Sequence, residues 1–298
     1  MSDIGRVLTA MATPFDRDGE VDYRQAANLA RALLDSGSEG LVVCGTTGES
    51  PTLSDKEKWQ LFAAVTKAVG GRGAVIAGTG SYNTAESVRL TREAEELGVD
   101  GVLTVVPYYN KPSQEGLFRH FEAIARATRL PVVLYNVPSR TVTNMTAETA
   151  IRLSRIPNIA GTKEASGDLS QIATIIENTR DDFLVWSGND EDTLPILAIG
   201  GYGVVSVASH LVGGQIQEMV QSFLGGNLDR AAGIHRRLLP LVKSLFLVGN
   251  PAPLKYALNH IGFEVGQPRL PLVEPDDEIQ DKIRAALGRQ RVDLPVAV

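Results

Sequence analysis

The sequence predicts an α/β protein, a (β/α)8 TIM barrel followed by a C-terminal helical extension. Short apolar runs rich in Val and Ile recur eight times, each followed by a turn and then a segment of helical period. The eight units occupy about 210 residues, which fits the size of such a barrel. A doubly wound open sheet is the alternative, but it would normally carry a ligand loop such as GxGxxG after its first strand, and the sequence has none there.

The strands are expected to be parallel, because neighbouring parallel strands need crossover connections of the kind that the intervening helical segments provide. A parallel sheet is covered on both faces, which explains why the runs are continuously apolar rather than alternating. The strands are expected at residues 6–13, 40–45, 74–78, 101–106, 131–135, 159–163, 183–187 and 203–207.

The segments between the strands have helical features. In residues 22–35, Ala26 and Leu29 fall on one apolar face of a helix. Ser54 and Glu57 have the spacing of a capping box, which indicates that the next helix begins there. Further helices are expected at residues 84–97, 113–127 and 147–154.

The pattern changes after the eighth strand, where no further strand signal remains. Helices are expected at residues 215–223, 228–248, 253–261 and 278–287. We therefore predict a catalytic barrel over residues 1–224 and a helical extension over residues 225–298, packed on the barrel rather than folded as an independent domain.

Composition and charge argue against several classes of function. A net charge of -6 and a pI near 5.4 provide no basic face for nucleic acid or an anionic membrane. No stretch approaches the roughly 18 apolar residues of a membrane span. The four histidines stand far apart without ligand spacing, so no metal site is expected. The single cysteine, Cys44, excludes an internal disulfide and suits a cytoplasmic protein, and we expect it to be a small core residue within a strand.

The chemistry of a barrel enzyme lies on the loops that follow the strands. The strand at 159–163 ends on Lys163, and the loss of hydration at such a position favours the neutral amine, which can attack a carbonyl. The simpler interpretation is a structural lysine paired with Glu164, Asp168 or another acid. We assign Glu164 no role beyond that of a local charge partner.

Other strand ends supply complementary groups. GTTGES follows the second strand, PYYN the fourth, and YNVPSR the fifth. Each has a structural interpretation as a helix cap, a space-filling tyrosine or a surface arginine. Together, however, amide-rich turns, hydroxyls, a guanidinium and a lysine favour a class I, metal-free aldolase or related lyase acting on a 2-oxo acid.

At these residues the sequence closely resembles the dihydrodipicolinate synthase family of pyruvate-dependent lyases. The resemblance covers nearly the whole chain. Four motifs carry it: GTTGES at 45–50, VVPYYNKPSQEGL at 105–117, LYNVPSRT at 134–141 and GTKEASGD at 161–168.

The resemblance implies catalytic roles without a metal or other cofactor. Lys163 matches the lysine that forms a Schiff base with pyruvate, and Tyr135 matches the general acid and base. Thr46 is similar to the threonine that links Tyr135 to a second tyrosine, here Tyr109, in a proton relay. Thr47 matches the residue that holds the pyruvate carboxylate.

The family also implies a substrate pocket and an assembly. Gly188 and Val205 match positions that line the pyruvate pocket. Arg140 matches the arginine that binds the carboxylate of L-aspartate-4-semialdehyde, so the expected product is 4-hydroxy-tetrahydrodipicolinate, on the way to diaminopimelate and lysine. In the family the tyrosine at the position of Tyr109 reaches across a tight dimer interface, and we expect a homotetramer built from such dimers.

One departure from the family concerns regulation. Ser50, Glu86 and Tyr108 match the site at which lysine inhibits family members, but Lys58 stands where feedback-sensitive members often carry histidine. A cation there would repel the ammonium group of lysine, so weak or absent inhibition is expected.

Two other functions are considered. A pyruvate-dependent aldolase of sugar acids or related 2-oxo acids, similar to N-acetylneuraminate lyase, is disfavoured by Arg140 and Tyr109. A non-catalytic, ligand-sensing barrel would be expected to have lost at least one catalytic group, yet Lys163, Tyr135 and Thr46 are all present.

Overall fold

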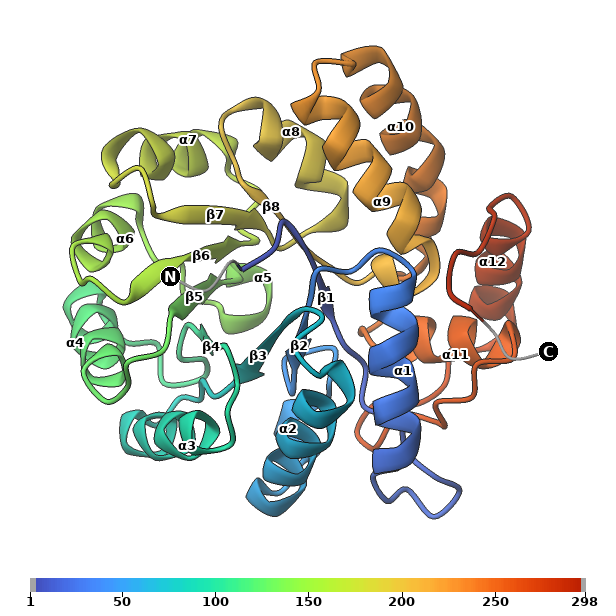
Figure 1. Cartoon of the computed structure of the whole chain (residues 1–298), viewed down its shortest axis with the longest axis horizontal. Coiled ribbons are helices and arrows are strands. Elements are labelled where there is room, and N and C mark those ends of the chain that lie inside the picture. The colour runs from blue at the N-terminus through green and yellow to red at the C-terminus, as the bar shows by residue number, and fades with distance from the viewer. Residues whose placement is uncertain (1–3, 296–298) are drawn as a thin grey trace.

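The computed structural model describes residues 4–295, and its centre is a closed barrel of eight parallel strands in sequence order (Figure 1). The predicted fold class is confirmed. The strands are β1 (Val7–Ala10), β2 (Gly40–Val43), β3 (Ala74–Gly78), β4 (Gly101–Val105), β5 (Val132–Asn136), β6 (Ile159–Glu164), β7 (Leu184–Ser187) and β8 (Gly203–Ser206).

Each strand is buried on both faces, so side chains pointing inward and outward belong to two separate apolar clusters. The smaller cluster includes Leu8, Ile76 and Val133 and fills the barrel. The larger cluster joins the outer face of the strands to the helices. Cys44 corrects one expectation, because it lies just after β2 rather than within it and has a positive φ of 56°.

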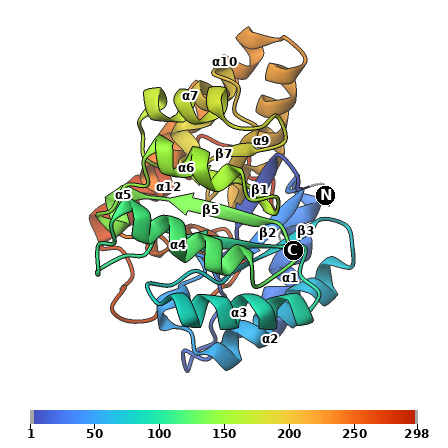
Figure 2. The same cartoon turned by 90° about the vertical axis from the view of Figure 1, so that its left-hand side faces the viewer.

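Helices surround the barrel, as Figures 1 and 2 show from two directions. The expected helices up to residue 154 are all present, and Ser54 and Glu57 form the predicted capping box. The helices between or beside the strands are α1 (Tyr23–Asp35), α2 (Asp55–Val69), α3 (Thr84–Glu96), α4 (Gln114–Ala125), α5 (Pro138–Thr141), α6 (Ala147–Ser154), α7 (Leu169–Asn178), α8 (Thr193–Ala198) and α9 (Ser209–Leu224).

Three of these helices, α5, α7 and α8, were not predicted individually. The first two follow the strand ends that carry Tyr135 and Lys163. Helix α7 did have a local signal, because the side chain of Asp168 accepts a hydrogen bond from the backbone N–H of Gln171 and caps the helix. The third, α8, spans only Thr193–Ala198, and so short a segment gives little helical periodicity.

Helix α9 begins at Ser209 rather than at residue 215. It bends at Val212, where the backbone is not helical, and Gly213 follows. A Cβ at Gly213 would lie 2.7 Å from the carbonyl oxygen of Ser36, so the glycine permits close packing on the end of α1. Gly213 therefore interrupts the helical pattern in the sequence but allows the helix to pack closely on α1.

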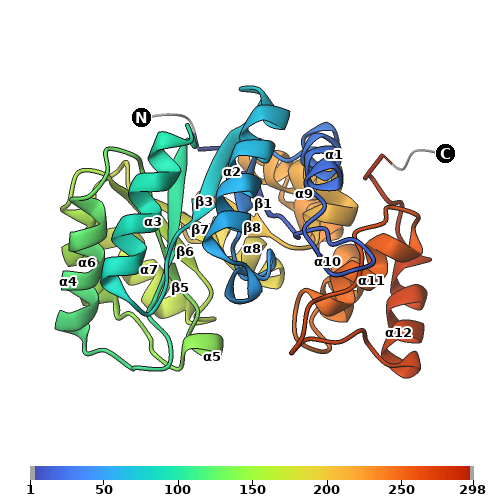
Figure 3. The ribbon, with the colours of Figure 1, turned by 90° about the horizontal axis from the view of Figure 1, so that it is seen from below.

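The extension consists of α10 (Leu228–Ser244), α11 (Ala252–His260) and α12 (Asp277–Leu287), on one side of the barrel (Figure 3). Helix α10 ends at Ser244 instead of residue 248. Leu245 is still buried, but the next three apolar residues, Phe246, Leu247 and Val248, are exposed. Ile234 and Leu254 belong to the same apolar cluster as the outer face of the barrel. No helix among residues 4–295 is both long and apolar enough to cross a membrane.

Candidate active site

A pocket with a volume of about 220 Å³ opens at the carboxyl ends of the barrel strands. The segments at and after the ends of β2, β3, β4 and β5 form its walls, which is where barrel enzymes carry their chemistry. Its polar lining includes Thr46, Ser50, Tyr108, Tyr135, Arg140 and Thr141. Three of the four sequence motifs, those at 45–50, 105–117 and 134–141, therefore contribute to one cavity.

Lys163 lies on β6 next to the strand that carries Tyr135. The two residues are register partners, and Nζ of Lys163 lies 4.2 Å from the centre of the Tyr135 ring. Lys163 is only 5% exposed, yet among the described residues no carboxylate lies within ion-pair distance of its Nζ. The side chain thus lacks the ion pair that the purely structural interpretation required.

Glu164 is fully buried and faces away from Lys163, as strand alternation requires. Its carboxylate accepts hydrogen bonds from Nδ2 of Asn136 at 2.8 Å and from Oγ of Ser166 at 2.6 Å. Burial raises the pKa of Glu164, and the Ser166 and Asn136 hydrogen bonds oppose that shift. Glu164 therefore ties the end of β6 to β5, and the expected role as a charge partner of Lys163 is wrong.

Thr46 and Thr47 lie together in the turn after β2 but have different surroundings. Thr46 lines the pocket and is partly exposed. Thr47 is 2% exposed, and its Oγ1 accepts a hydrogen bond from Nδ2 of Asn250 at 2.9 Å. No hydrogen bond joins Thr46 to Tyr135 within the described part of one chain, so the predicted relay stays a prediction.

Tyr109 and Arg140 are both exposed, but only Arg140 lines the pocket. Tyr109 is 91% exposed and has a positive φ of 69°, which is unusual for a residue with a side chain. A single chain therefore brings Thr46, Tyr135 and Arg140 to one cavity and leaves Tyr109 outside it.

Gly188 and Val205 lie at the ends of the last two strands. A Cβ at Gly188 would lie 3.1 Å from Cε of Lys163 and 2.8 Å from Cβ of Ala165. Glycine at this position therefore leaves room for the lysine side chain. Val205 is 1% exposed and belongs to the apolar cluster inside the barrel.

Asp190 is a buried acid that the sequence analysis did not single out. Its carboxylate accepts hydrogen bonds from the Oγ of Ser206 and from the backbone N–H groups of Val207 and Ala208. Burial raises the pKa of Asp190, and these hydrogen bonds and the positive charge of Lys163 oppose that rise. Its position two residues after Gly188, at the end of a strand, was the available signal.

The four residues of the expected effector site are divided between the pocket and its surroundings. Ser50 and Tyr108 line the pocket. Burial raises the pKa of Tyr108, with a smaller contribution from the negative charge of Glu86. Lys58 is 9% exposed and has no ion pair among the described residues.

His210 is buried and hydrogen-bonded to the backbone. Nε2 of His210 accepts a hydrogen bond from the backbone N–H of Ala12, so its Nδ1 carries the proton donated to the carbonyl oxygen of Val207. Burial lowers the pKa of His210 to about 4. Within residues 4–295, no group of three His, Cys, Asp or Glu side chains is arranged to hold a metal ion.

A buried lysine beside a tyrosine, at the carboxyl end of a (β/α)8 barrel, fits the chemistry of a Schiff-base lyase. A model of the dihydrodipicolinate synthetase family matches residues 3–290, and the chain belongs to that family.

Similar proteins agree with this assignment. A 4-hydroxy-tetrahydrodipicolinate synthase of Dehalococcoides mccartyi is 62% identical over 99% of this chain and 100% of its own length. The crystal structure of a dihydrodipicolinate synthase from Bacillus anthracis is 47% identical, with a TM-score of 0.95 over 97% of this chain and 99% of that chain. A lysine-bound enzyme from Cyanidioschyzon merolae is 49% identical, with a TM-score of 0.95 over 96% of this chain and 98% of that one.

Proposed function

We propose that this chain condenses pyruvate with L-aspartate-4-semialdehyde to give 4-hydroxy-tetrahydrodipicolinate, a step toward diaminopimelate and lysine. The observation that carries the proposal is the pairing of Lys163 with Tyr135, whose ring centre lies 4.2 Å from Nζ, beside a pocket also lined by Arg140. The proton-transfer group therefore lies against the nucleophile and lines the same pocket as a cation that can bind a carboxylate. The names of the similar proteins support the same substrates.

The first half of the reaction takes place on Lys163. Its amine adds to the ketone of pyruvate, water leaves, and the resulting iminium makes the adjacent methyl carbon acidic. Tyr135 is placed to accept and return protons during these steps. Thr47 holds the pyruvate carboxylate. The iminium serves as the electron sink, so this mechanism calls for neither a metal ion nor another cofactor.

The second half joins the two substrates. The enamine carbon attacks the aldehyde of the semialdehyde, and Arg140 binds the carboxylate of that substrate. The amine of the semialdehyde then adds to the iminium carbon and displaces Lys163, which closes the ring. One water is released overall, and the lysine is regenerated.

Borohydride reduction in the presence of pyruvate, followed by peptide mapping, tests the first half. A reduced pyruvate adduct is expected on Lys163, and an unmodified Lys163 would contradict the mechanism. Arg140→Ala tests the second half. It is expected to raise KM for the semialdehyde by roughly tenfold or more, since a hydrogen-bonded charge pair is lost, while pyruvate trapping persists. Unchanged semialdehyde kinetics would remove the role of Arg140.

The proposal includes a dimer in which Tyr109 completes the partner's site, within a homotetramer in the cytoplasm. Support comes from Tyr109 itself, which is 91% exposed in one chain and lies outside the pocket. Mixing two inactive variants, Tyr109→Phe and Lys163→Ala, is expected to restore activity, because mixed dimers combine an intact Lys163 with an intact Tyr109. No recovery after subunit exchange, or a monomer by light scattering, would contradict this assembly.

A further inference from the structure

The turn that carries Thr46 and Thr47 has an unusual backbone. Glu49, near its end, has a φ of 55°, a left-handed conformation that residues with a side chain rarely adopt. Such a conformation costs free energy and persists only where the surrounding structure holds it. The turn therefore needs stabilising contacts from residues elsewhere in the chain.

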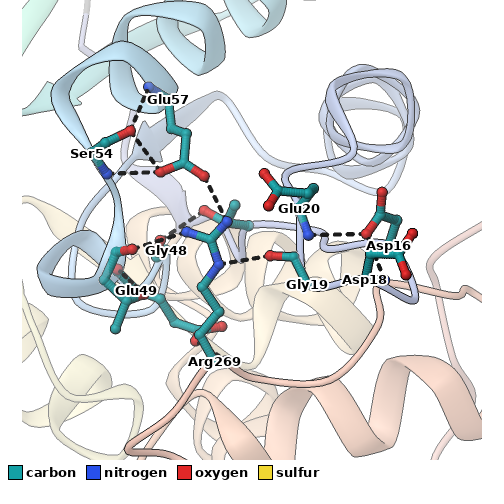
Figure 4. A network of polar contacts seen from close by, with 11 residues as sticks. Asp16, Asp18, Gly19, Glu20, Gly48, Glu49, Ser54, Glu57 and Arg269 are labelled. Carbon is teal, nitrogen blue, oxygen red and sulfur yellow. Dashed lines mark hydrogen bonds and ion pairs between the residues drawn. The ribbon is translucent and has the colours of Figure 1, made fainter.

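Two residues of the C-terminal extension, Lys255 and Arg269, supply those contacts, and Figure 4 shows Arg269 beside Glu49 and Glu57. The buried Nζ of Lys255 lies 2.6 Å from Oε1 of Glu49, and the backbone N–H of Arg269 donates to Oε2 of Glu49 at 2.8 Å. The guanidinium of Arg269 also donates to the carbonyl oxygen of Thr52 and to the carboxylate of Glu57, both on the stretch that leads from the turn into α2. The turn is thus fixed from the side of the extension.

The same segment also contacts the residue proposed to bind substrate. Asn250 is 5% exposed and donates from Nδ2 to Oγ1 of Thr47 at 2.9 Å. A threonine hydroxyl has one hydrogen to donate and two lone pairs that accept. Because Asn250 occupies one lone pair, the Thr47 hydrogen points elsewhere and is available to a carboxylate.

We infer that Asn250 is a positioning residue that makes the Thr47 hydroxyl a hydrogen-bond donor to the pyruvate carboxylate, on a turn held in place by Lys255 and Arg269. The inference rests on the proposed function, since it assigns Thr47 to pyruvate. It also gives the extension a part in substrate binding, although its helices lie beside the barrel rather than around it.

The experiment is a double-mutant cycle with Thr47→Val and Asn250→Asp, with steady-state kinetics in pyruvate. A carboxylate at position 250 only accepts hydrogen bonds, so it draws the Thr47 hydrogen away from the substrate. Each single variant is expected to raise KM for pyruvate by roughly tenfold or more, the cost of a lost hydrogen bond to a charged group. In the Thr47→Val background, Asn250→Asp is expected to raise KM no more than about threefold further, because the two changes remove one interaction.

Asn259→Asp is the matched control. Asn259 lies on α11, and within residues 4–295 its side chain bonds only to the backbone of Gly266 and Val265, so its substitution is expected to lower the melting temperature without changing KM for pyruvate. Asn250→Ala is a second variant for the case in which the aspartate variant does not fold. It adds no charge and is expected to raise KM for pyruvate by a smaller factor.

Two results would overturn the inference. One is an unchanged KM in Asn250→Asp, which would mean that Thr47 already donates to residue 250. The other is an equal rise of KM in both backgrounds, which would mean that the new negative charge simply repels pyruvate. Failure of the proposed function is distinct, because then Thr47→Val itself would leave pyruvate binding unchanged.

Discussion

Lys163 and Lys255 are two buried lysines with different neighbours. Lys163 is 5% exposed with Nζ 4.2 Å from the centre of the Tyr135 ring, and Lys255 is 1% exposed with Nζ 3.9 Å from the centre of the Phe15 ring. Within the described residues, Lys255 has a carboxylate partner, Glu49 at 2.6 Å, and Lys163 has none. Burial against an aromatic ring therefore does not by itself distinguish a nucleophile from a structural lysine.

A lowered pKa is not by itself the mark of a nucleophile. Burial lowers the pKa of Lys255 to about 8, against the opposing effect of Glu49, although no reaction is assigned to it. The difference lies in the neighbours. Tyr135 has a hydroxyl that can move a proton and lines the pocket, whereas Phe15 has no such group. The feature that sets Lys163 apart is thus a neighbour able to transfer a proton, rather than burial.

The largest expected effect comes from changing each lysine in turn and trapping pyruvate with borohydride. Lys163→Arg retains the charge but cannot form the imine, so it is expected to lose the adduct and to lower kcat/KM on the order of a thousandfold or more. Lys255→Met is expected to keep the adduct on Lys163 in the folded fraction. An adduct on Lys255 in the Lys163→Arg variant would contradict the assignment of Lys255 as a structural lysine.

The next effect is on stability. Lys255→Met leaves the Glu49 charge buried without its lysine partner, which is expected to lower the free energy of unfolding by about 3–5 kcal/mol. Lys282→Met is the matched control, because its ion pair with Glu278 has the same 2.6 Å distance but is exposed. That change is expected to leave the free energy of unfolding nearly unchanged, because solvent screens an exposed ion pair. Denaturant titration measures both, and equal losses would contradict a structural role for Lys255.

A smaller effect concerns acid stability around the same network. The hydrogen bond from Arg269 lowers the pKa of Glu57 to about 2, compared with 4.5 for the free group. The folded state therefore binds the proton less tightly, and the stabilisation is fully present above pH 4.5 and is lost as the pH falls toward 2. Glu57→Gln is expected to flatten the fall of unfolding free energy in this range. An unchanged slope would mean that Glu57 is not ion-paired in solution.

The strand ends were predictable because their signals are local. An apolar run followed by a polar turn locates Lys163 and Tyr135, and the rule that chemistry follows barrel strands places them on one end of the fold. Helix α9 was harder to predict, since its glycines pack against α1 and interrupt the helical pattern.

The contacts of the extension could not be predicted, because they are non-local. Asn250 bonds to Thr47 across 203 positions of sequence, and Lys255 pairs with Glu49 over a similar span. Asparagine and lysine at helix boundaries have many ordinary explanations, and nothing beside them in the sequence indicates their partners. Asp190 was missed for a related reason, since its hydrogen-bond donors come from the end of β8 and the residues that follow it.

The smallest expected effect concerns a third buried lysine, Lys58, which extends the comparison. It is 9% exposed and, like Lys163, has no carboxylate partner in the described structure, but it does not lie against the ring of Tyr135 as Lys163 does. An ammonium group there repels the ammonium of an incoming lysine. Initial rates are therefore expected to change little with sub-millimolar lysine, and Lys58→His is expected to increase inhibition by removing the fixed charge. Strong inhibition of the unchanged enzyme at such concentrations would show that Lys58 does not oppose effector binding.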